Sequence, residues 1–431
     1  MAIPRRKRVL IIAAFFILMA WHSMNAPEPT KASYSTPFHH PLFHQSIPIN
    51  RETPIAADVE SIVHIADEAK ILVYLHSNRT TCIEPQLIGR LSGYFLSKIK
   101  WSYQHVTNHN VIVGRYTVPS PGNYFLEIIA TMCQALDMDT DATNVCLIDP
   151  SQHRLTMDNA TLDAALITTN NNNNAEGIGF WYNKNEVTMD TTDATSSIKP
   201  LFTRYQPQNC RGDNAALDRC KIPTDVTRFD PYEFQFNSQF FLNDEYLKGK
   251  EGRLCFIGAS HSRVLARFAN QISNNIHVLQ VDHRYVANLT QSEVGYASKC
   301  GKVVIGMGQW DAGHHGMGPT SFRELKKEMN RAMLEFVKPL LDANVSVYFR
   351  NMHYNPLGDL ITQCPPADWR NPNVVDTYNI ITKELCNEFQ VPFIDTTDIT
   401  GIMWDRQEDW AHFKDISGEL EARYFLYRVF S

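Results

Sequence analysis

The sequence predicts an α/β fold: a three-layer α/β/α domain built on a parallel sheet, preceded by a β-sandwich module and an N-terminal membrane anchor. Three observations lead to this prediction. Strands alternate with helices after residue 253, short β-type segments occupy the preceding part, and an apolar stretch follows a basic N-terminus. With 431 residues, 44% hydrophobic, the chain can build two domains with ample cores. The scattered net charge of −6 does not indicate nucleic-acid binding.

The N-terminal segment determines the expected compartment. Basic residues 5–8 precede an apolar stretch at 9–21, as in a secretion signal. The stretch is shorter than the roughly 20 residues that a spanning helix needs, but no clean cleavage site follows it. We expect residues 1–22 to be a cytosolic tail and signal-anchor, which places the remainder in the lumen by the positive-inside rule. Secretion after cleavage is the alternative.

Three further regions follow along the chain. Residues 23–56 carry prolines among polar residues and predict an extended stem. Residues 57–223 predict the β-rich module, with strands at 71–76, 111–118 and 124–130. The segment GRYTVPSPGNYFLEI resembles an immunoglobulin- or filamin-like repeat. Residues 224–431 predict the α/β domain.

Sequons and cysteines agree with a lumenal, oxidising setting. The nine cysteines lack CxxC pairs, so a zinc site is not expected and several of them should form disulfides; the odd count leaves at least one thiol unpaired. Cys255, within an apolar strand, is the expected free thiol. Four asparagines begin Asn-x-Ser/Thr sequons and are candidate glycosylation sites: Asn78, Asn159, Asn288 and Asn344.

In the α/β domain, apolar strands at 254–257, 276–281, 303–306, 345–349 and 391–395 alternate with helical patterns. One helix begins with the capping box formed by Ser321 and Glu324. Others are expected at 374–389 and at 418–430. Alternation of this kind predicts parallel strands, and functional groups collect at their carboxyl ends.

Ser260 is the candidate nucleophile because it follows the first of these strands, in the sequence CFIGASHSR. A tight turn there would lift its hydroxyl above the sheet, and the next helix would supply backbone N–H groups and a positive dipole end. Gly258 would let the turn pack closely. The alternative is that Ser260 only caps the helix.

His412 is the candidate general base and Asp409 the candidate residue that orients it; both lie just before the expected terminal helix. A spacing of three residues lets the carboxylate reach the Nδ1–H of the imidazole, so that Nε2 can accept the serine proton. The chain order, serine after the first strand and Asp-x-x-His beside the last helix, makes this more than a surface pair.

Together, GxSxxR after a strand, the block Gly308-Gln309-Trp310 and the terminal DxxH resemble the SGNH (GDSL-type) hydrolase superfamily over roughly residues 225–431. Within it, the chain is similar to a eukaryotic branch that includes trichome-birefringence-like polysaccharide acetyltransferases and neurexophilin-and-PC-esterase-like proteins. The resemblance implies a Golgi type II membrane protein in which Ser260, Asp409 and His412 form a catalytic triad.

The sequence departs from that superfamily at two places. Most relatives have GDS where this chain has Ala259 before the serine, so a carboxylate is missing. The superfamily's oxyanion-hole Asn is replaced by Gln309, after Gly308; its amide could donate to the oxyanion, or Gln309 could be a loop residue.

Other polar and aromatic residues near these motifs are weaker candidates. Arg263 could bind a carboxylate or a sugar hydroxyl, or lie on the helix surface. Trp310 and Trp410 could stack on a sugar ring or serve as packing. Adjacent residues such as His314 and His315 seldom both point into one site, so no metal is predicted.

The leading functional hypothesis is a serine-dependent O-acetyltransferase or esterase acting on a glycan. It needs no cofactor, although a transferase would need an acyl donor such as acetyl-CoA. The competing hypothesis is a non-catalytic glycan- or protein-binding protein that retains the fold of an enzyme.

Overall fold

The computed structural model describes residues 44–79, 85–106, 109–132, 154–157, 159–164, 179–183, 232–236, 244–313, 320–354, 370, 372–402, 412–413 and 416–431. The expected signal-anchor at 1–22 lies outside these residues, as do Asp409, Trp410, His314 and His315. Within the described part, no helix is long and apolar enough to cross a membrane.

Two antiparallel sheets form the β-rich part of the described chain. The first has the order β1-β2-β3-β7-β6, with β1 His44–Ile47, β2 Val59–Ile65, β3 Lys70–Leu75, β6 Lys100–Val106 and β7 His109–Arg115. The second has the order β11-β10-β5-β4-β8-β9, with β4 Gln86–Ser92, β5 Phe95–Lys98, β8 Gly122–Met132, β9 Thr161–Ala164, β10 Gly179–Asn183 and β11 Tyr232–Phe236. Short 3₁₀ turns, η1 Pro54–Asp58 and η2 Ala66–Glu68, flank β2.

Inward side chains of both sheets share one hydrophobic core. Val73 and Ile112 of the first sheet belong to the same buried cluster as Leu91 and Leu126 of the second. In β3, buried residues alternate with half-buried ones, as expected for a strand with one face on the core. The strands predicted at 71–76, 111–118 and 124–130 are confirmed as β3, β7 and β8. The immunoglobulin- or filamin-like identity of the module stays a prediction.

The expected stem does not extend to residue 56. β1 pairs with β2, and Ile47 and Ile55 are buried in the module's core. The prolines make this segment resemble an extended linker in the sequence. In the structure, Pro54 is instead the first residue of a 3₁₀ turn. At the other end, β11 pairs with β10 beyond the expected domain boundary at 223.

Helices connect and cover the strands of the α/β domain. They are α2 Asp244–Lys248, α3 Ser260–Ile272, α4 Gln291–Ala297, α5 Phe322–Ala332, the π-helical turn η8 Met333–Val337, α6 Lys338–Asp342, α7 Pro372–Glu388, α8 Thr397–Thr400 and α9 Ile416–Phe430, with a 3₁₀ turn, η7 Val286–Asn288. The predicted capping box is confirmed in part, because the Ser321 hydroxyl accepts a hydrogen bond from the backbone N–H of Glu324.

Five parallel strands form the central sheet of this domain. They are β12 Gly252–Gly258, β13 Ile276–Asp282, β14 Lys302–Gly306, β15 Ser346–Arg350 and β16 Phe393–Ile394, in the order β13-β12-β14-β15-β16. The chain leaves β12 for β13 on one side and then crosses to β14 on the other. In open α/β sheets, binding sites usually lie at such a reversal of strand order, beyond the carboxyl ends of the strands.

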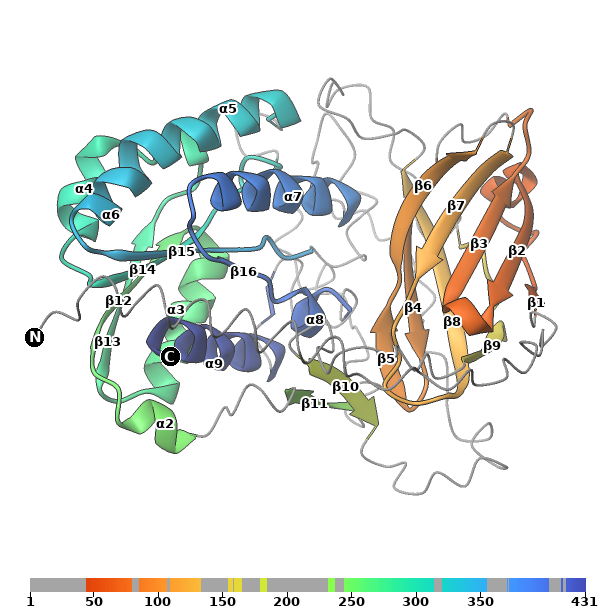
Figure 1. The fold of residues 1–431 in the computed structure, drawn as a ribbon, viewed down its shortest axis with the longest axis horizontal. Helices are drawn as coiled ribbons and strands as arrows, with labels where there is room; N and C mark the ends of the chain where they lie inside the picture. The colour runs from red at the N-terminus through yellow and green to blue at the C-terminus, as the bar shows by residue number, and fades with distance from the viewer. Residues whose placement is uncertain are drawn as a thin grey trace, which may run out of the picture. The chain divides into compact units, whose positions relative to one another are not determined.

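Both faces of the parallel sheet are covered, so the predicted three layers are observed. Cys255 and Ile257 of β12 pack in the cluster that includes α5 and α7, whereas Leu254 and Phe256 pack in the cluster that includes α3 and α9. Figure 1 shows α4, α5, α6 and α7 on one face and α3 and α9 on the other. This continuous burial on both faces explains why β12 lacks a period of two.

The expectation for Cys255 is wrong. Cys255 forms a disulfide with Cys300, with their Cα atoms 5.8 Å apart, and Cys386 is the buried free thiol within the described residues. Cys300 lies just before β14, which is the neighbour of β12 in the sheet. The pairing could not be read from the sequence because the sequence does not show which strands are neighbours. All four sequon asparagines are exposed, as glycosylation would require.

Candidate active site

Ser260 is the first residue of α3 and lies directly beyond the turn at the carboxyl end of β12. β12 is an interior strand between β13 and β14. The first backbone N–H groups of a helix have no acceptor within the helix, and the aligned peptide dipoles make this end positive. Ser260 is half-buried. Its position therefore agrees with the strand–turn–helix arrangement expected from the sequence.

Gly258 determines how closely this turn approaches the neighbouring strand. Its φ is 146°, and a Cβ atom there would overlap the carbonyl oxygen of Gly306 and the hydroxyl of Ser262. The carbonyl oxygen of Gly258 accepts a hydrogen bond of 3.2 Å from the Gln280 amide and one of 3.3 Å from the His283 backbone. Only glycine fits this conformation without strain. The turn that precedes Ser260 is therefore fixed by hydrogen bonds from the β13 side and by close contact with Gly306 of β14.

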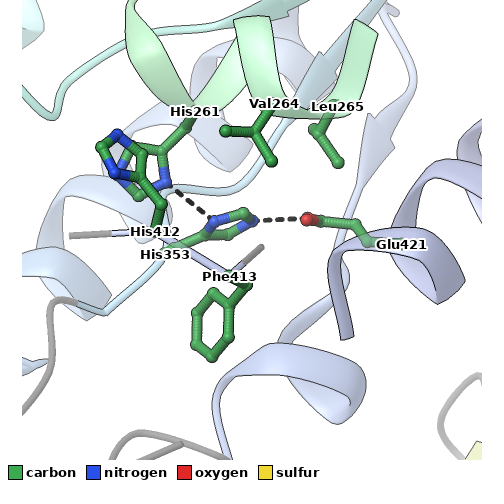
Figure 2. A pocket seen from close by; sticks show the side chains of 7 residues that line it. All are labelled: His261, Val264, Leu265, His353, His412, Phe413 and Glu421. Carbon is green, nitrogen blue, oxygen red and sulfur yellow. Dashed lines mark hydrogen bonds and ion pairs between the residues drawn. The ribbon is translucent and has the colours of Figure 1, made fainter. Parts of the chain in front are cut away.

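A buried chain of hydrogen bonds begins at the next residue, His261. Its Nδ1 lies 2.9 Å from Nδ1 of His353, which follows β15, and Nε2 of His353 lies 2.5 Å from Oε1 of Glu421 on α9. Figure 2 shows this succession, with dashed lines from His261 to His353 and on to Glu421. All three side chains are almost completely buried. Three segments of the domain thus meet through their polar side chains in the interior.

Neighbouring groups hold the carboxylate end of this chain. The Thr396 hydroxyl lies 2.6 Å from Oε1 of Glu421, and its backbone N–H donates to Oδ1 of Asn351 at 2.9 Å. Arg350, at the end of β15, donates to the Asn351 carbonyl and lies 3.2 Å from Nε2 of His353. Because a charge in the interior must be compensated, the guanidinium of Arg350 balances the carboxylate of Glu421.

The pKa directions describe a neutral imidazole pair beside an ionised carboxylate. Burial lowers the pKa of His261 well below its ordinary value, and the neighbouring His353 and His412 lower it further. Burial also lowers the pKa of His353. Burial opposes the ionisation of Glu421, but the contact with His353, the charge of Arg350 and the Thr396 hydrogen bond outweigh it, so its pKa is lowered.

His412 lies beside this chain. Its ring centroid is 5.0 Å from that of His261, with an angle of 43° between the ring planes. One pocket brings these residues together (Figure 2). It is lined by His261, Val264, Leu265, His353, His412, Phe413 and Glu421. The structure therefore brings the proposed base next to the residue that follows Ser260, although about 150 residues separate them in the sequence. Asp409 lies outside the described residues.

The segment after β14, which contains Gly308 and Gln309, contacts the segment that bears His353. Gln309 is buried, and its amide nitrogen donates to the His353 carbonyl at 2.6 Å, while its Oε1 has no hydrogen-bond partner among the described residues. One of the Gln309 amide hydrogens, expected to donate to the oxyanion, thus donates to the backbone carbonyl of His353 instead. Gly308, directly before Gln309, has a φ of 103°, a conformation that favours glycine.

Trp310 and Arg263 lie away from the pocket lining. Trp310 packs edge-on against Tyr285, with the Arg284 guanidinium 4.6 Å from its ring centroid. Arg263 is exposed on α3 and pairs with Asp282 at 3.5 Å. The structure favours packing for Trp310 and a helix-surface position for Arg263, the two alternatives that the sequence left open.

Sequence reasoning missed His261, His353 and Glu421. A signal for Glu421 was present, because it interrupts the apolar face of the terminal helix, where a carboxylate needs a partner. His353 lies just beyond the carboxyl end of the parallel strand β15, in the region where functional groups were expected. Among the described residues, no group of three or more His, Cys, Asp or Glu side chains could hold a metal ion.

Comparison with known proteins gives distant structural similarity. No family model matches the sequence, and no curated protein matches it. Similar solved structures include the acetyl xylan esterase AlAXEase (13% identity, TM-score 0.30, 40% of this chain and 98% of that one). An acetyl xylan esterase variant from Geobacillus stearothermophilus has 18% identity and a TM-score of 0.29, covering 42% of this chain and 94% of that one. The native M. smegmatis aryl esterase has 14% identity and a TM-score of 0.29, covering 41% and 97%.

Proposed function

We propose that this protein is a serine-dependent carbohydrate esterase or O-acetyltransferase of the secretory pathway, anchored as a Golgi type II membrane protein, with Ser260 as its nucleophile. The observation that carries the proposal is the meeting of two distant segments at one pocket. The helix start that bears Ser260 and the segment that bears His412 lie together at the carboxyl edge of a parallel sheet. The SGNH-like motifs of the sequence support the glycan substrate.

In the proposed reaction, His412 accepts the hydroxyl proton of Ser260 while the serine oxygen attacks the ester carbonyl. Backbone N–H groups at the start of α3 stabilise the resulting oxyanion. His412 then donates the proton to the leaving alcohol, which leaves an acyl group on Ser260. A water molecule or a sugar hydroxyl attacks this acyl-enzyme, giving hydrolysis or transfer. Asp409 would orient His412, and a transferase would take its acyl group from a donor such as acetyl-CoA.

A fluorophosphonate probe tests the nucleophile directly. We expect labelling of the folded full-length chain, loss of labelling in Ser260→Ala, and retention in Ser298→Ala, which changes an exposed serine on the same domain. Absence of labelling in the folded wild-type protein would overturn the enzymatic proposal. Mass spectrometry of acetylated and unacetylated glycans incubated with the protein then shows the direction in which acetyl groups move.

A non-catalytic, glycan-binding role is the second candidate. It is favoured by one observation, the hydrogen bond that commits the Gln309 amide to the His353 carbonyl. In that case the wild-type chain would bind glycans without reacting with the probe, and His412→Ala would leave this binding unchanged.

A further inference from the structure

The two residues His412 and Phe413, called the His412 segment below, pack against three different parts of the α/β domain. The His412 ring centroid lies 5.0 Å from that of His261 on α3. The Phe413 ring is edge-on to the ring of His353, with the centroids 5.6 Å apart. The backbone of the segment approaches α9 at Gly418. The position of the proposed base therefore depends on how firmly these three supports are fixed.

Gly418, in the first turn of α9, lets this helix approach the backbone of the His412 segment. Its φ is not positive, so the backbone conformation does not require glycine there. A Cβ atom at Gly418 would overlap the carbonyl oxygen of Phe413 and would lie 2.9 Å from the ring of Phe268 on α3. Because rotation of a side chain cannot relieve an overlap with a backbone oxygen, the segment itself would have to move.

Glu421, about one turn further along α9, fixes the other supports of the segment. It is completely buried, and its Oε1 lies 2.5 Å from Nε2 of His353. Nδ1 of His353 in turn lies 2.9 Å from Nδ1 of His261, so one carboxylate orients both rings that the His412 segment contacts (Figure 2). The space that these described side chains line has no room for a water molecule. A displacement of one ring is therefore passed to the next by direct contact.

We propose that Gly418 and Glu421 are positioning residues for His412: α9 holds the base at the start of α3 through one close backbone contact and one buried carboxylate. Neither residue touches substrate. The inference rests on the proposed function, in which His412 accepts the proton of Ser260. A base must lie within hydrogen-bond reach of the proton that it accepts, and a displacement of about 1 Å costs about 100-fold in rate. The contribution of α9 is thus to rate and not to substrate affinity.

Gly418→Ala tests the backbone contact, and Gly295→Ala is its matched control. Gly295 is also a helical glycine, in α4, but a Cβ there would have no atom within 4 Å. Alanine favours the helix at both positions, whereas only Gly418→Ala should displace the His412 segment. We expect fluorophosphonate labelling of the folded full-length chain to be about 100-fold slower in Gly418→Ala and unchanged in Gly295→Ala. With 4-nitrophenyl acetate, kcat should fall by a similar factor at constant KM, because the base acts in the transition state.

NMR of the full-length chain with carbon-13-labelled histidines locates His412 without any turnover. A ring that packs against another aromatic ring has a displaced resonance, and His412→Gln identifies the signal. In the wild type, the His412 signal should differ from that of a solvent-exposed histidine because of the His261 ring. In Gly418→Ala it should move toward the exposed value, and in Gly295→Ala it should stay.

Two substitutions of Glu421 test the buried carboxylate. Glu421→Gln keeps an oxygen that can accept from His353, so it should retain the His412 signal and lose at most about tenfold in kcat, as expected for one weakened hydrogen bond. Glu421→Leu removes the acceptor and should resemble Gly418→Ala in both measurements. Equal effects of the two substitutions in folded chains would contradict an orienting role of the carboxylate.

A folded Gly418→Ala chain with the wild-type His412 signal and the wild-type labelling rate would overturn the proposal. A displaced signal with unchanged labelling would overturn it as well, because the place of His412 would then not affect the reaction. A wild-type signal at the exposed value would also overturn it, and this measurement decides even if the variants on α9 fail to fold. If the folded wild type is not labelled but the signals behave as expected, the proposed function alone is refuted, and the dependence of the His412 position on α9 is supported.

Discussion

Replacing Gly258 with alanine tests the close packing on which the position of Ser260 depends. Two effects add. The φ of 146° is strained for any residue with a Cβ, at a cost of about 1–2 kcal/mol, and the added carbon overlaps the Gly306 carbonyl and Ser262, at a further cost of about 1–3 kcal/mol. We therefore expect the free energy of unfolding to fall by roughly 2–5 kcal/mol.

The same strand offers a matched control. Gly252, at the other end of β12, has a φ of 143°, but a Cβ there would meet only Phe430, at an ordinary 3.5 Å. Gly252→Ala should thus show the cost of the backbone conformation alone. Urea unfolding gives the two stabilities, and probe labelling gives the reactivity of Ser260 in the folded fraction.

The expected result is a larger loss of stability for Gly258→Ala, together with slower labelling by about 100-fold, because small displacements of a nucleophile have effects of that size. Labelling of Gly252→Ala should match the wild type. If Gly258→Ala were no less stable than Gly252→Ala and reacted as fast as the wild type, the close approach of β12 and β14 would not position the nucleophile.

Two further predictions concern buried charges outside the pocket. Glu127 pairs with the fully buried Arg90 at 2.7 Å, so Glu127→Gln should lower the free energy of unfolding by about 3–5 kcal/mol, and Arg90→Met with Glu127→Leu should recover most of it in urea unfolding. A loss under about 1 kcal/mol in the single variant would show that the pair is solvated. Burial raises the pKa of Asp311 from 3.8 to about 7, so the folded chain binds a proton that the unfolded chain releases between these pH values. The free energy of unfolding of the wild type, relative to that of Asp311→Asn, should therefore fall as the pH rises from 4 to 7. A stability difference that stays constant over this range would show that the carboxyl is not buried as described.

The α/β domain was predictable because each of its strands is a short apolar segment between amphipathic helices. β12, β13, β14 and β15 fall within one or two residues of their expected positions. The β-rich module was predictable only where strands alternate clearly, as in β3. β1 was missed because it has four residues among prolines, and its burial comes from pairing with β2 rather than from its own pattern.

The site was predictable to the extent that its residues follow strands or belong to short motifs. Ser260 and Gly258 satisfy that condition, and both lie where the sequence placed them. The pairing of Cys255 with Cys300 and the contact between His261 and His353 depend instead on which strands become neighbours. That information is carried by the topology of the sheet, and a spacing of 45 or 92 residues along the chain does not reveal it.

The missing carboxylate at Ala259 has less weight once the surroundings of Ser260 are considered. A carboxylate beside a nucleophile contributes hydrogen bonds and negative charge, and Ala259 supplies neither. In this chain the residue after the serine, His261, connects through His353 to the ionised Glu421 within the same pocket. A carboxylate at position 259, which is itself buried, would lose its hydration in the interior, and this is costly for a charged group unless it is paired and hydrogen-bonded. Ala259→Asp should therefore impair folding rather than restore a more reactive enzyme, and this outcome would distinguish a rearranged polar site from a degraded one.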